Sequence, residues 1–371
     1  MGHKKEVSFN FLFLLAFSVL NIFLVYVSLW YLILTFGILL ILILKKIKYT
    51  YILIFIVSSF IPLDISFLIG KYNVFNHLAN WIDNFIHFSL RNFLISFIKN
   101  NYSLTDSNVI ELLIFNIKTN SGKYIYQLMI NMSVVHLIVI SGLHLSIIAW
   151  INQKIFKRTP KVCFTINLLL ITFMCYLLNF SISTLRVLFY LTIAFVFKKW
   201  KPNKFDAVSI SGFISVCINP FGAINLGFLM SYLCTITIIY INQFKLSNFW
   251  IQFLLTNLCA FIVSLPFVLQ INSKISLFVV INSFIFSYFI IFIFIAVLMF
   301  VWIPFLINLI HSLINLMINV IMAFNYLNIQ INLIRWNHLI VNLYLSVLLF
   351  SYYVFNLIKS KSVSNSEKIS Y

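Results

Sequence analysis

Apolar runs long enough to cross a membrane follow one another along almost the whole chain of 371 residues. Hydrophobic residues make up 63% of the sequence and charged residues only 9%, whereas about a quarter of a soluble domain is charged. A helix needs about 20 apolar residues to cross the hydrocarbon core of a bilayer. The sequence therefore predicts an all-α fold, a polytopic bundle of transmembrane helices.

We expect about twelve spans, with the first long run counted as two helices that a turn joins near Tyr26–Trp30. The predicted spans are 9–44 (two helices), 50–69, 132–151, 162–180, 184–197, 207–218, 224–241, 249–271, 276–302, 304–324 and 339–357. They divide the chain into four parts, which are amino-terminal helices over 1–70, an outer region over 71–131, a transmembrane core over 132–358 and a basic polar tail over 359–371.

The net charge of +18 fits this topology, because Lys and Arg collect in the cytoplasmic loops of membrane proteins. With the amino terminus placed inside, most of the basic residues fall in predicted cytoplasmic segments, and only Arg186 falls within a span. We therefore expect both termini to lie in the cytoplasm.

The outer region over 71–131 is expected to be more than a loop. Apolar residues recur at helical spacing over Leu78–Ile98, which predicts one helix that lies on the outer membrane face or against the bundle. Thr105–Ser107 predicts the cap of a second helix that continues through Glu111–Ile117. Asn120–Gly122 predicts a turn.

Four basic residues of the outer region are candidates for contact with single-stranded nucleic acid, which binds basic groups through its backbone and aromatic rings through its bases. They are Arg91, Lys99, Lys118 and Lys123, and Tyr102, Tyr124 and Tyr126 accompany them. A belt of interfacial aromatic residues with basic side chains that reach the headgroups gives the same pattern. Both interpretations stay open at this point.

The predicted span over 132–151 contains His136, Ser141 and His144 around Gly142. In hydrocarbon a polar side chain costs free energy unless it is paired or lines a wet cavity. Three explanations compete: a Ser-His catalytic pair, which also needs an oxyanion hole; hydrogen bonds between closely packed helices; or a broken helix along a hydrophilic passage. The residue types favour the last two over the first.

The stretch His136-Leu-Ile-Val-Ile-Ser-Gly-Leu-His-Leu145 resembles the H-L-x-x-I-S-G-L-H motif of the ComEC competence family. Further segments resemble that family in the same order, namely Ser183-Thr-Leu-Arg186, Asn219-Pro220, Gly227-Phe-Leu-Met-Ser-Tyr-Leu233, Ser264-Leu-Pro266 and Asn282. The similarity covers about Asn76–Val301. The sequence departs from the family at Ile182 and Leu229, where the family has Pro and Gln.

The resemblance implies a channel component for uptake of single-stranded transforming DNA across the bacterial cytoplasmic membrane. The residues that it places along the DNA path are His136, Ser141, Gly142, His144, Arg186, Gly227 and Ser231. The partners that it implies are the DNA strand and the lipid bilayer, with a DNA receptor, a helicase or a separate nuclease. The OB-like and metallo-β-lactamase-like domains of full-length members are not recognised in this sequence, so we expect no nuclease activity.

Arg186 has two interpretations, because a charged side chain near the end of a span can reach the interface with its head group. Alternatively it faces the bundle, beside Asp64, Asn179 or Asn225, and offers its charge to a phosphate backbone.

Two other classes of function are weighed against DNA uptake. A secondary transporter or flippase for a small polar or lipid-linked solute predicts discontinuous helices in two related halves, and we find no internal repeat. A membrane enzyme would depend on Ser141 and His144. We expect no enzyme, cofactor or metal, because the sequence has no P-loop or Rossmann pattern and its five cysteines have neither metal-ligand nor redox spacing.

Overall fold

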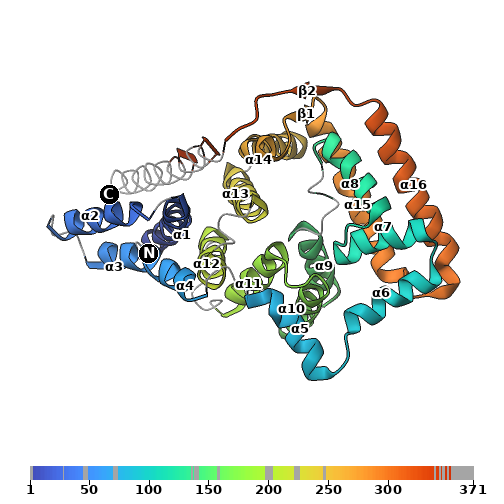
Figure 1. Cartoon of the computed structure of the whole chain (residues 1–371), viewed down its shortest axis with the longest axis horizontal. Helices are drawn as coiled ribbons and strands as arrows, with labels where there is room; N and C mark the ends of the chain where they lie inside the picture. Colours follow the sequence, from blue (N-terminus) through green and yellow to red (C-terminus); the bar gives the residue numbers. More distant parts are fainter. Residues whose placement is uncertain are drawn as a thin grey trace. The chain divides into compact units, whose positions relative to one another are not determined.

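The computed structural model describes residues 3–27, 29–44, 49–69, 74–134, 137, 142–156, 159–196, 204–220, 226–244, 248–337, 340, 341, 344, 347, 348 and 351. Helices dominate this part of the chain, as Figure 1 shows, which confirms the all-α prediction. The chain divides into two compact units. The first comprises Met1–Val74, Phe189–Phe244 and Trp336–Tyr371, and the second comprises Phe75–Leu188 and Lys245–Arg335.

The first unit is built around its amino-terminal helix. Its described helices are α1 (His3–Val27), α2 (Tyr31–Leu44), α3 (Tyr49–Ser59), α4 (Ile61–Ile69), α12 (Lys204–Ile218), α13 (Leu226–Ile241) and the short 3-10 helix η4 (Asn242–Phe244). Helix α1 packs against α3 and α12, and it buries Leu12, Leu15, Val19 and Ile22, which share one face of a helix.

The apolar segments of this unit are interrupted at two helix boundaries. The turn expected near Tyr26–Trp30 is confirmed, because α1 ends at Val27 and α2 begins at Tyr31. The span expected over 50–69 is divided into α3 and α4 at Phe60. Pro62, the second residue of α4, explains the division, because proline lacks a backbone N–H and restricts the residue before it.

Gly212 of α12 lies close to side chains of α1 and α13. A Cβ atom at this position would come within 2.8 Å of Leu15 Cδ2 and 3.0 Å of Tyr232 Cε1. We expect Gly212→Val to lower the free energy of unfolding by about 1–3 kcal/mol, measured as a lower melting temperature in detergent. Gly37→Val is the control, because a Cβ at Gly37 has no atom within 4 Å. Equal melting temperatures for both variants would contradict the close packing at Gly212.

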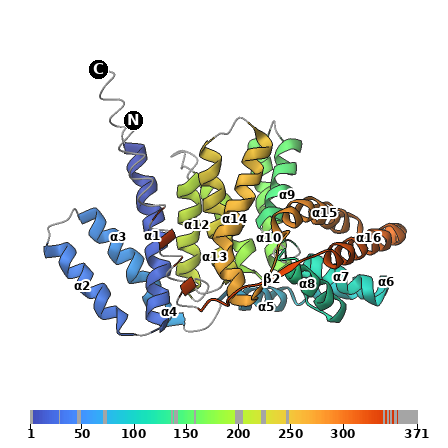
Figure 2. The same cartoon turned by 90° about the horizontal axis from the view of Figure 1, so that it is seen from above.

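The second unit surrounds helix α7. Its elements are α5 (Val74–Ile86), α6 (Leu90–Asn101), α7 (Leu104–Phe115), α8 (Asn120–Asn131), α9 (Gly142–Ile155), α10 (Pro160–Leu177), part of α11 (Ile182–Val196), α14 (Phe249–Ile271), β1 (Lys274–Ser276), α15 (Val279–Phe300), η5 (Pro304–Leu306), α16 (Ile307–Tyr326) and β2 (Gln330–Asn332). Helix α7 packs against α6, α8, α15 and α16, and every residue over Asp106–Phe115 is buried. Helices α9, α10 and α14 are nearly end-on in Figure 1 and upright in Figure 2, whereas α6 and α16 run across them.

The outer region differs from the sequence prediction in three places. The single helix expected over Leu78–Ile98 is two helices, because His87 adopts a left-handed backbone conformation (φ 54°) and Ser89 caps α6. Helix α7 begins at Leu104, with Ser103 as its cap instead of a residue of Thr105–Ser107. The turn expected over Asn120–Gly122 is wrong, since these residues form the first turn of α8.

Three described helices are long and apolar enough to cross a membrane, namely Trp250–Gln270, Val279–Phe300 and Pro304–Tyr326. Shorter apolar helices cover Leu14–Val25, Thr35–Leu44, Ile52–Ile65, Lys161–Leu177, Thr184–Val196 and Gly227–Ile241. These helices are those of a membrane protein. The count of twelve spans and the cytoplasmic termini stay predictions, and most of the span expected over 339–357 lies outside the described residues.

One short antiparallel sheet joins parts of the second unit that are distant in sequence. Strands β1 and β2 pair with Ile275 opposite Ile331, and α15 and α16 lie between them along the chain. The strand pair therefore holds the two ends of the α15–α16 segment together.

Candidate functional site: the competence motif and a buried carboxylate cluster

His144, from the motif over 136–145, lies inside the second unit. It belongs to the first turn of α9, which begins at Gly142, and only 2% of its surface is exposed. Its ring meets the ring of Phe294 of α15 in an edge-to-face contact, with 4.8 Å between centroids. His136 and Ser141 lie outside the described residues, so how these two side chains are arranged stays a prediction.

The chain before the motif does not continue as a helix. Ser133 has a left-handed backbone conformation (φ 61°), and α8 has already ended at Asn131. The continuous span expected over 132–151 is therefore wrong in its first part. The non-helical backbone at Ser133 is what the broken-helix explanation requires between α8 and the motif, whereas residues 138–141 lie outside the described part of the chain.

Hydrogen bonds from the strand pair hold the segment that leads into the motif. The backbone N–H of Ser276 donates to Ser133 Oγ at 3.0 Å, and Asn282 Nδ2 donates to Ser276 Oγ at 3.2 Å. Asn328 Nδ2 donates to the carbonyl of Asn131 at 2.9 Å. These bonds fix the position at which the chain leaves α8, and Asn282 contributes to them.

The other predicted path residues lie in different units. Arg186 is half-buried on α11 within the second unit, whereas Gly227 is exposed and Ser231 half-buried on α13 of the first unit. Of the partners considered for Arg186, Asp64 is exposed on α4 and Asn225 lies outside the described residues. A shared path along all of these residues stays a prediction.

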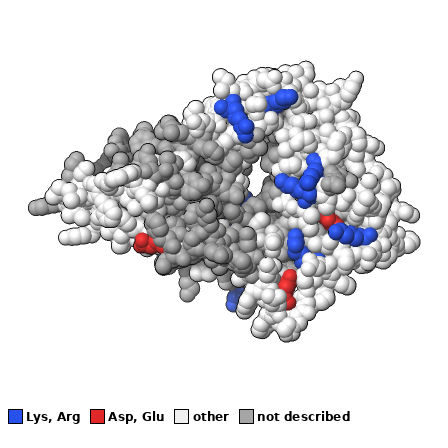
Figure 3. All heavy atoms as spheres, in the orientation of Figure 1, with Lys and Arg blue, Asp and Glu red and all other residues white. Residues whose placement is uncertain are grey.

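Three of the four outer basic residues contact their own unit. Arg91 Nε donates to the carbonyl of Leu177 at 2.9 Å, and Lys99 Nζ lies 3.5 Å from Glu111 Oε1. Lys118 Nζ lies 3.7 Å from the centroid of the Tyr126 ring, whereas Lys123 is exposed on α8. On the face drawn in Figure 3, the basic side chains of the described residues do not form one continuous patch, and acidic atoms lie beside one of them.

Helix α7 carries two buried carboxylates, Asp106 and Glu111, which are 3% and 1% exposed. Each is paired with a basic side chain whose surface is about half exposed. Lys99 of α6 pairs with Glu111, and His311 of α16 pairs with Asp106, with 2.7 Å between His311 Nδ1 and Asp106 Oδ2. A buried carboxylate needs such a partner, because its charge is costly in a medium of low dielectric constant.

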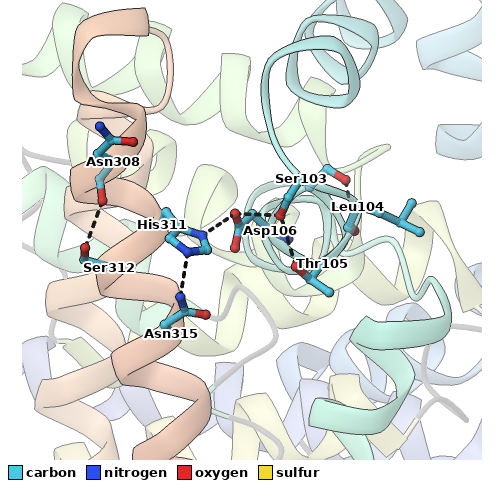
Figure 4. Close-up of polar contacts among 9 residues, drawn as sticks. Ser103, Leu104, Thr105, Asp106, Asn308, His311, Ser312 and Asn315 are labelled. Atoms are coloured by element: carbon cyan, nitrogen blue, oxygen red, sulfur yellow. Dashed lines mark hydrogen bonds and ion pairs between the residues drawn. The ribbon is translucent and has the colours of Figure 1, made fainter.

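Figure 4 shows that the His311 ring lies between Asp106 of α7 and Asn315 of its own helix. Ser103 Oγ donates to the same Asp106 oxygen at 2.7 Å, and His311 Nε2 lies 2.8 Å from Asn315 Nδ2. A carboxylate only accepts hydrogen bonds, so His311 Nδ1 carries a proton and donates. In the neutral ring Nε2 then accepts from the Asn315 amide, which fixes the orientation of the imidazole.

Tyr102 lies beside this cluster, and its hydroxyl donates to the carbonyl of Val301 at 2.8 Å. Burial, followed by the negative charge of Asp106, raises the pKa of Tyr102 above its ordinary value of 10.0. The phenol therefore keeps its proton at neutral pH and remains a donor. Its hydrogen bond links the end of α6 to the end of α15.

Sequence reasoning missed the cluster of Asp106 and His311. Asp106 was interpreted as part of a helix cap, and His311 lies within the span expected over 304–324. His311 could have indicated the cluster, because an ionisable residue within an apolar segment usually has a partner or a function.

Comparison with known proteins gives the family of the chain. The family model of the competence protein matches residues 113–358. The uncharacterized protein MG316 of Mycoplasma genitalium is 26% identical over 174 residues, which are 47% of this chain and 46% of that protein. The MG316 homolog of Mycoplasma pneumoniae is 29% identical over 214 residues, 56% of this chain and 53% of that protein.

The chain thus spans about half the length of the curated relatives that it matches. No solved structure matches it. The family model covers well over half of the chain and includes His144, Arg186 and the strand pair. This chain therefore belongs to the competence protein family, of the ComEC type.

Proposed function

We propose that this chain is a component of a channel that takes up single-stranded transforming DNA across the bacterial cytoplasmic membrane, which it crosses several times. The match to the competence protein over residues 113–358 carries the proposal, since competence involves the uptake of DNA. Three membrane-length apolar helices support it.

The proposed DNA path includes the motif residues His136, Ser141, Gly142 and His144, with Arg186, Gly227 and Ser231. The left-handed backbone at Ser133, between α8 and the motif, supports this assignment, because irregular backbone at membrane depth is tolerated where it is buried in protein or lines a cavity. In this proposal the chain catalyses no reaction and binds no cofactor. A helicase, a nuclease or a DNA receptor on another chain acts on the strand.

The outer basic residues Arg91, Lys99, Lys118 and Lys123 are proposed to receive the strand. The contact of Lys118 with the Tyr126 ring supports this role, because a basic group beside an aromatic ring suits both the phosphate and the base of a single strand. The exposed ammonium group of Lys123 adds a second positive charge to α8.

The test is uptake of labelled DNA by cells that carry His144→Gln or Arg186→Ala. We expect both variants to lower uptake at least fivefold, while the amount of protein in the membrane is unchanged. Leu169→Ala is the control, because Leu169 is exposed on α10 and belongs to no proposed path. Wild-type uptake in both variants would refute the assignment of these residues to the path.

A further inference from the structure

The outward face of α16 carries a row of polar side chains. The exposed residues of this row, called the α16 stripe below, are Asn308, His311, Ser312, Asn315, Asn319 and Tyr326. At 3.6 residues per turn they fall within an arc of about 100°, which also contains the exposed side chain of Met322. The buried residues of the helix, Ile310, Ile314, Met317 and Ile321, lie on the opposite side.

Lipid tails are an unsuitable neighbour for the α16 stripe. Helix α16 belongs to a segment that is long and apolar enough to cross a membrane, yet an amide in hydrocarbon costs free energy unless it is hydrogen-bonded. If α16 crosses the bilayer, this cost applies to the stripe in full; if α16 lies along the bilayer, its polar face is turned to water. The stripe therefore faces water or a polar partner.

The stripe is partly organised in advance. Asp106 Oδ2 lies 2.7 Å from His311 Nδ1, and His311 Nε2 lies 2.8 Å from Asn315 Nδ2. Figure 4 shows this chain of contacts, which orders both side chains without a new partner. An asparagine amide carries two donors and an acceptor with two lone pairs. Asn308, Asn315 and Asn319 therefore offer a row of neutral groups that can bind phosphate oxygens or base edges.

The neighbouring helix α8 carries an exposed basic group and an exposed aromatic ring. Helix α8 packs against α16, and Asn328, just after α16, bonds to Asn131 at the end of α8. Lys123 stands eight residues before Asn131, about 12 Å back along α8. Tyr124 beside it is 56% exposed, and Tyr326 at the end of the stripe is 90% exposed.

We propose that the α16 stripe, with Lys123 and Tyr124 of α8, is a contact surface for single-stranded nucleic acid. Amides, a basic group and exposed rings together suit a single strand, whose bases stack on aromatic side chains. Neutral amides also bind weakly enough for a strand to move on, as conduction requires. The inference rests on the proposed function and adds a surface outside the competence motif.

A second copy of the chain suits this surface less well. Asn, Ser and His side chains can also form hydrogen bonds between packed helices, so the argument against a second copy rests on charge. The positive charge of Lys123 would repel a second copy of itself across a two-fold contact, whereas it attracts a polyanion.

The test measures the reaction of engineered cysteines with a water-soluble thiol reagent in the full chain, reconstituted in lipid vesicles. We expect Asn319→Cys and Ser312→Cys to react, and an unlabelled single-stranded DNA oligonucleotide to slow both reactions at least threefold. Leu309→Cys is the control, because Leu309 is exposed on α16 outside the stripe, and its rate should not respond to the oligonucleotide. The wild-type chain gives the background from its five cysteines.

Two results would overturn the inference. One is a reaction at both stripe positions that the oligonucleotide does not slow. The other is efficient disulfide formation between copies of Asn319→Cys, which would assign the stripe to a second copy. If cells took up labelled DNA at the normal rate while the oligonucleotide failed to slow the cysteine reactions, this inference alone would be refuted. If the oligonucleotide slowed the cysteine reactions but cells with the wild-type chain took up no labelled DNA, the proposed function alone would be refuted.

Discussion

Replacing Phe294 by alanine is expected to lower the free energy of unfolding by about 3–5 kcal/mol. Phe294 is 1% exposed in the core of the second unit, and its ring packs against His144 of the competence motif. Truncation removes apolar burial and leaves a cavity that the neighbouring helices fill only in part. The measurement is the melting temperature of the purified protein in detergent.

The same helix offers a matched control for Phe294. Phe292, two residues earlier on α15, is 63% exposed, so its replacement by alanine creates no cavity. We expect Phe292→Ala to melt within a few degrees of the wild type. If both variants lost the same stability, the burial of Phe294 against His144 would be wrong.

Asp106→Ala is expected to lower the free energy of unfolding by about 2–3 kcal/mol. Its carboxylate accepts hydrogen bonds from Ser103 and His311, and a hydrogen bond to a charged group contributes about 1.5–3 kcal/mol. Two such bonds would sum to about 3–6 kcal/mol, and the expected loss lies at or below the bottom of that range, because His311 is half exposed and water can replace its partner. Thermal unfolding in detergent measures this loss.

Two further variants test whether the loss of stability in Asp106→Ala comes from the missing hydrogen-bond acceptor at this position. Asp106→Asn keeps an acceptor oxygen of the same shape, so it should lose less stability than Asp106→Ala. Asp64→Ala removes an exposed carboxylate on α4 and should leave the melting temperature unchanged. A wild-type melting temperature for Asp106→Ala would show that the contact between α7 and α16 does not depend on this carboxylate.

The helices followed from the sequence wherever hydrophobicity and capping residues agree. Helix α14 has the predicted bounds Phe249–Ile271, because the polar residues Asn248 and Asn272 delimit its apolar run. The helix expected over Leu78–Ile98 failed for a different reason. Its apolar spacing continues through His87, and only the left-handed backbone at that residue reveals the break.

The candidate site was predicted in part. The motif around His144 is a local pattern, so a resemblance could identify it. The partners that hold the site are remote, since 205 positions separate Asp106 from His311 and 143 separate Ser133 from Ser276. Pattern analysis along one sequence cannot pair such residues, because the pairing depends on how α7 packs against α16.

The two carboxylates of α7 acquire their partners at different times during synthesis. Lys99 is already made when Glu111 leaves the ribosome, so their ion pair is local. His311 follows Asp106 by 205 residues, which is about 10–40 s of translation at 5–20 residues per second. Of the two described side chains that bond to the Asp106 carboxylate, Ser103 alone has then been made. The second unit can therefore reach its final packing only late, when α16 arrives to cover the start of α7.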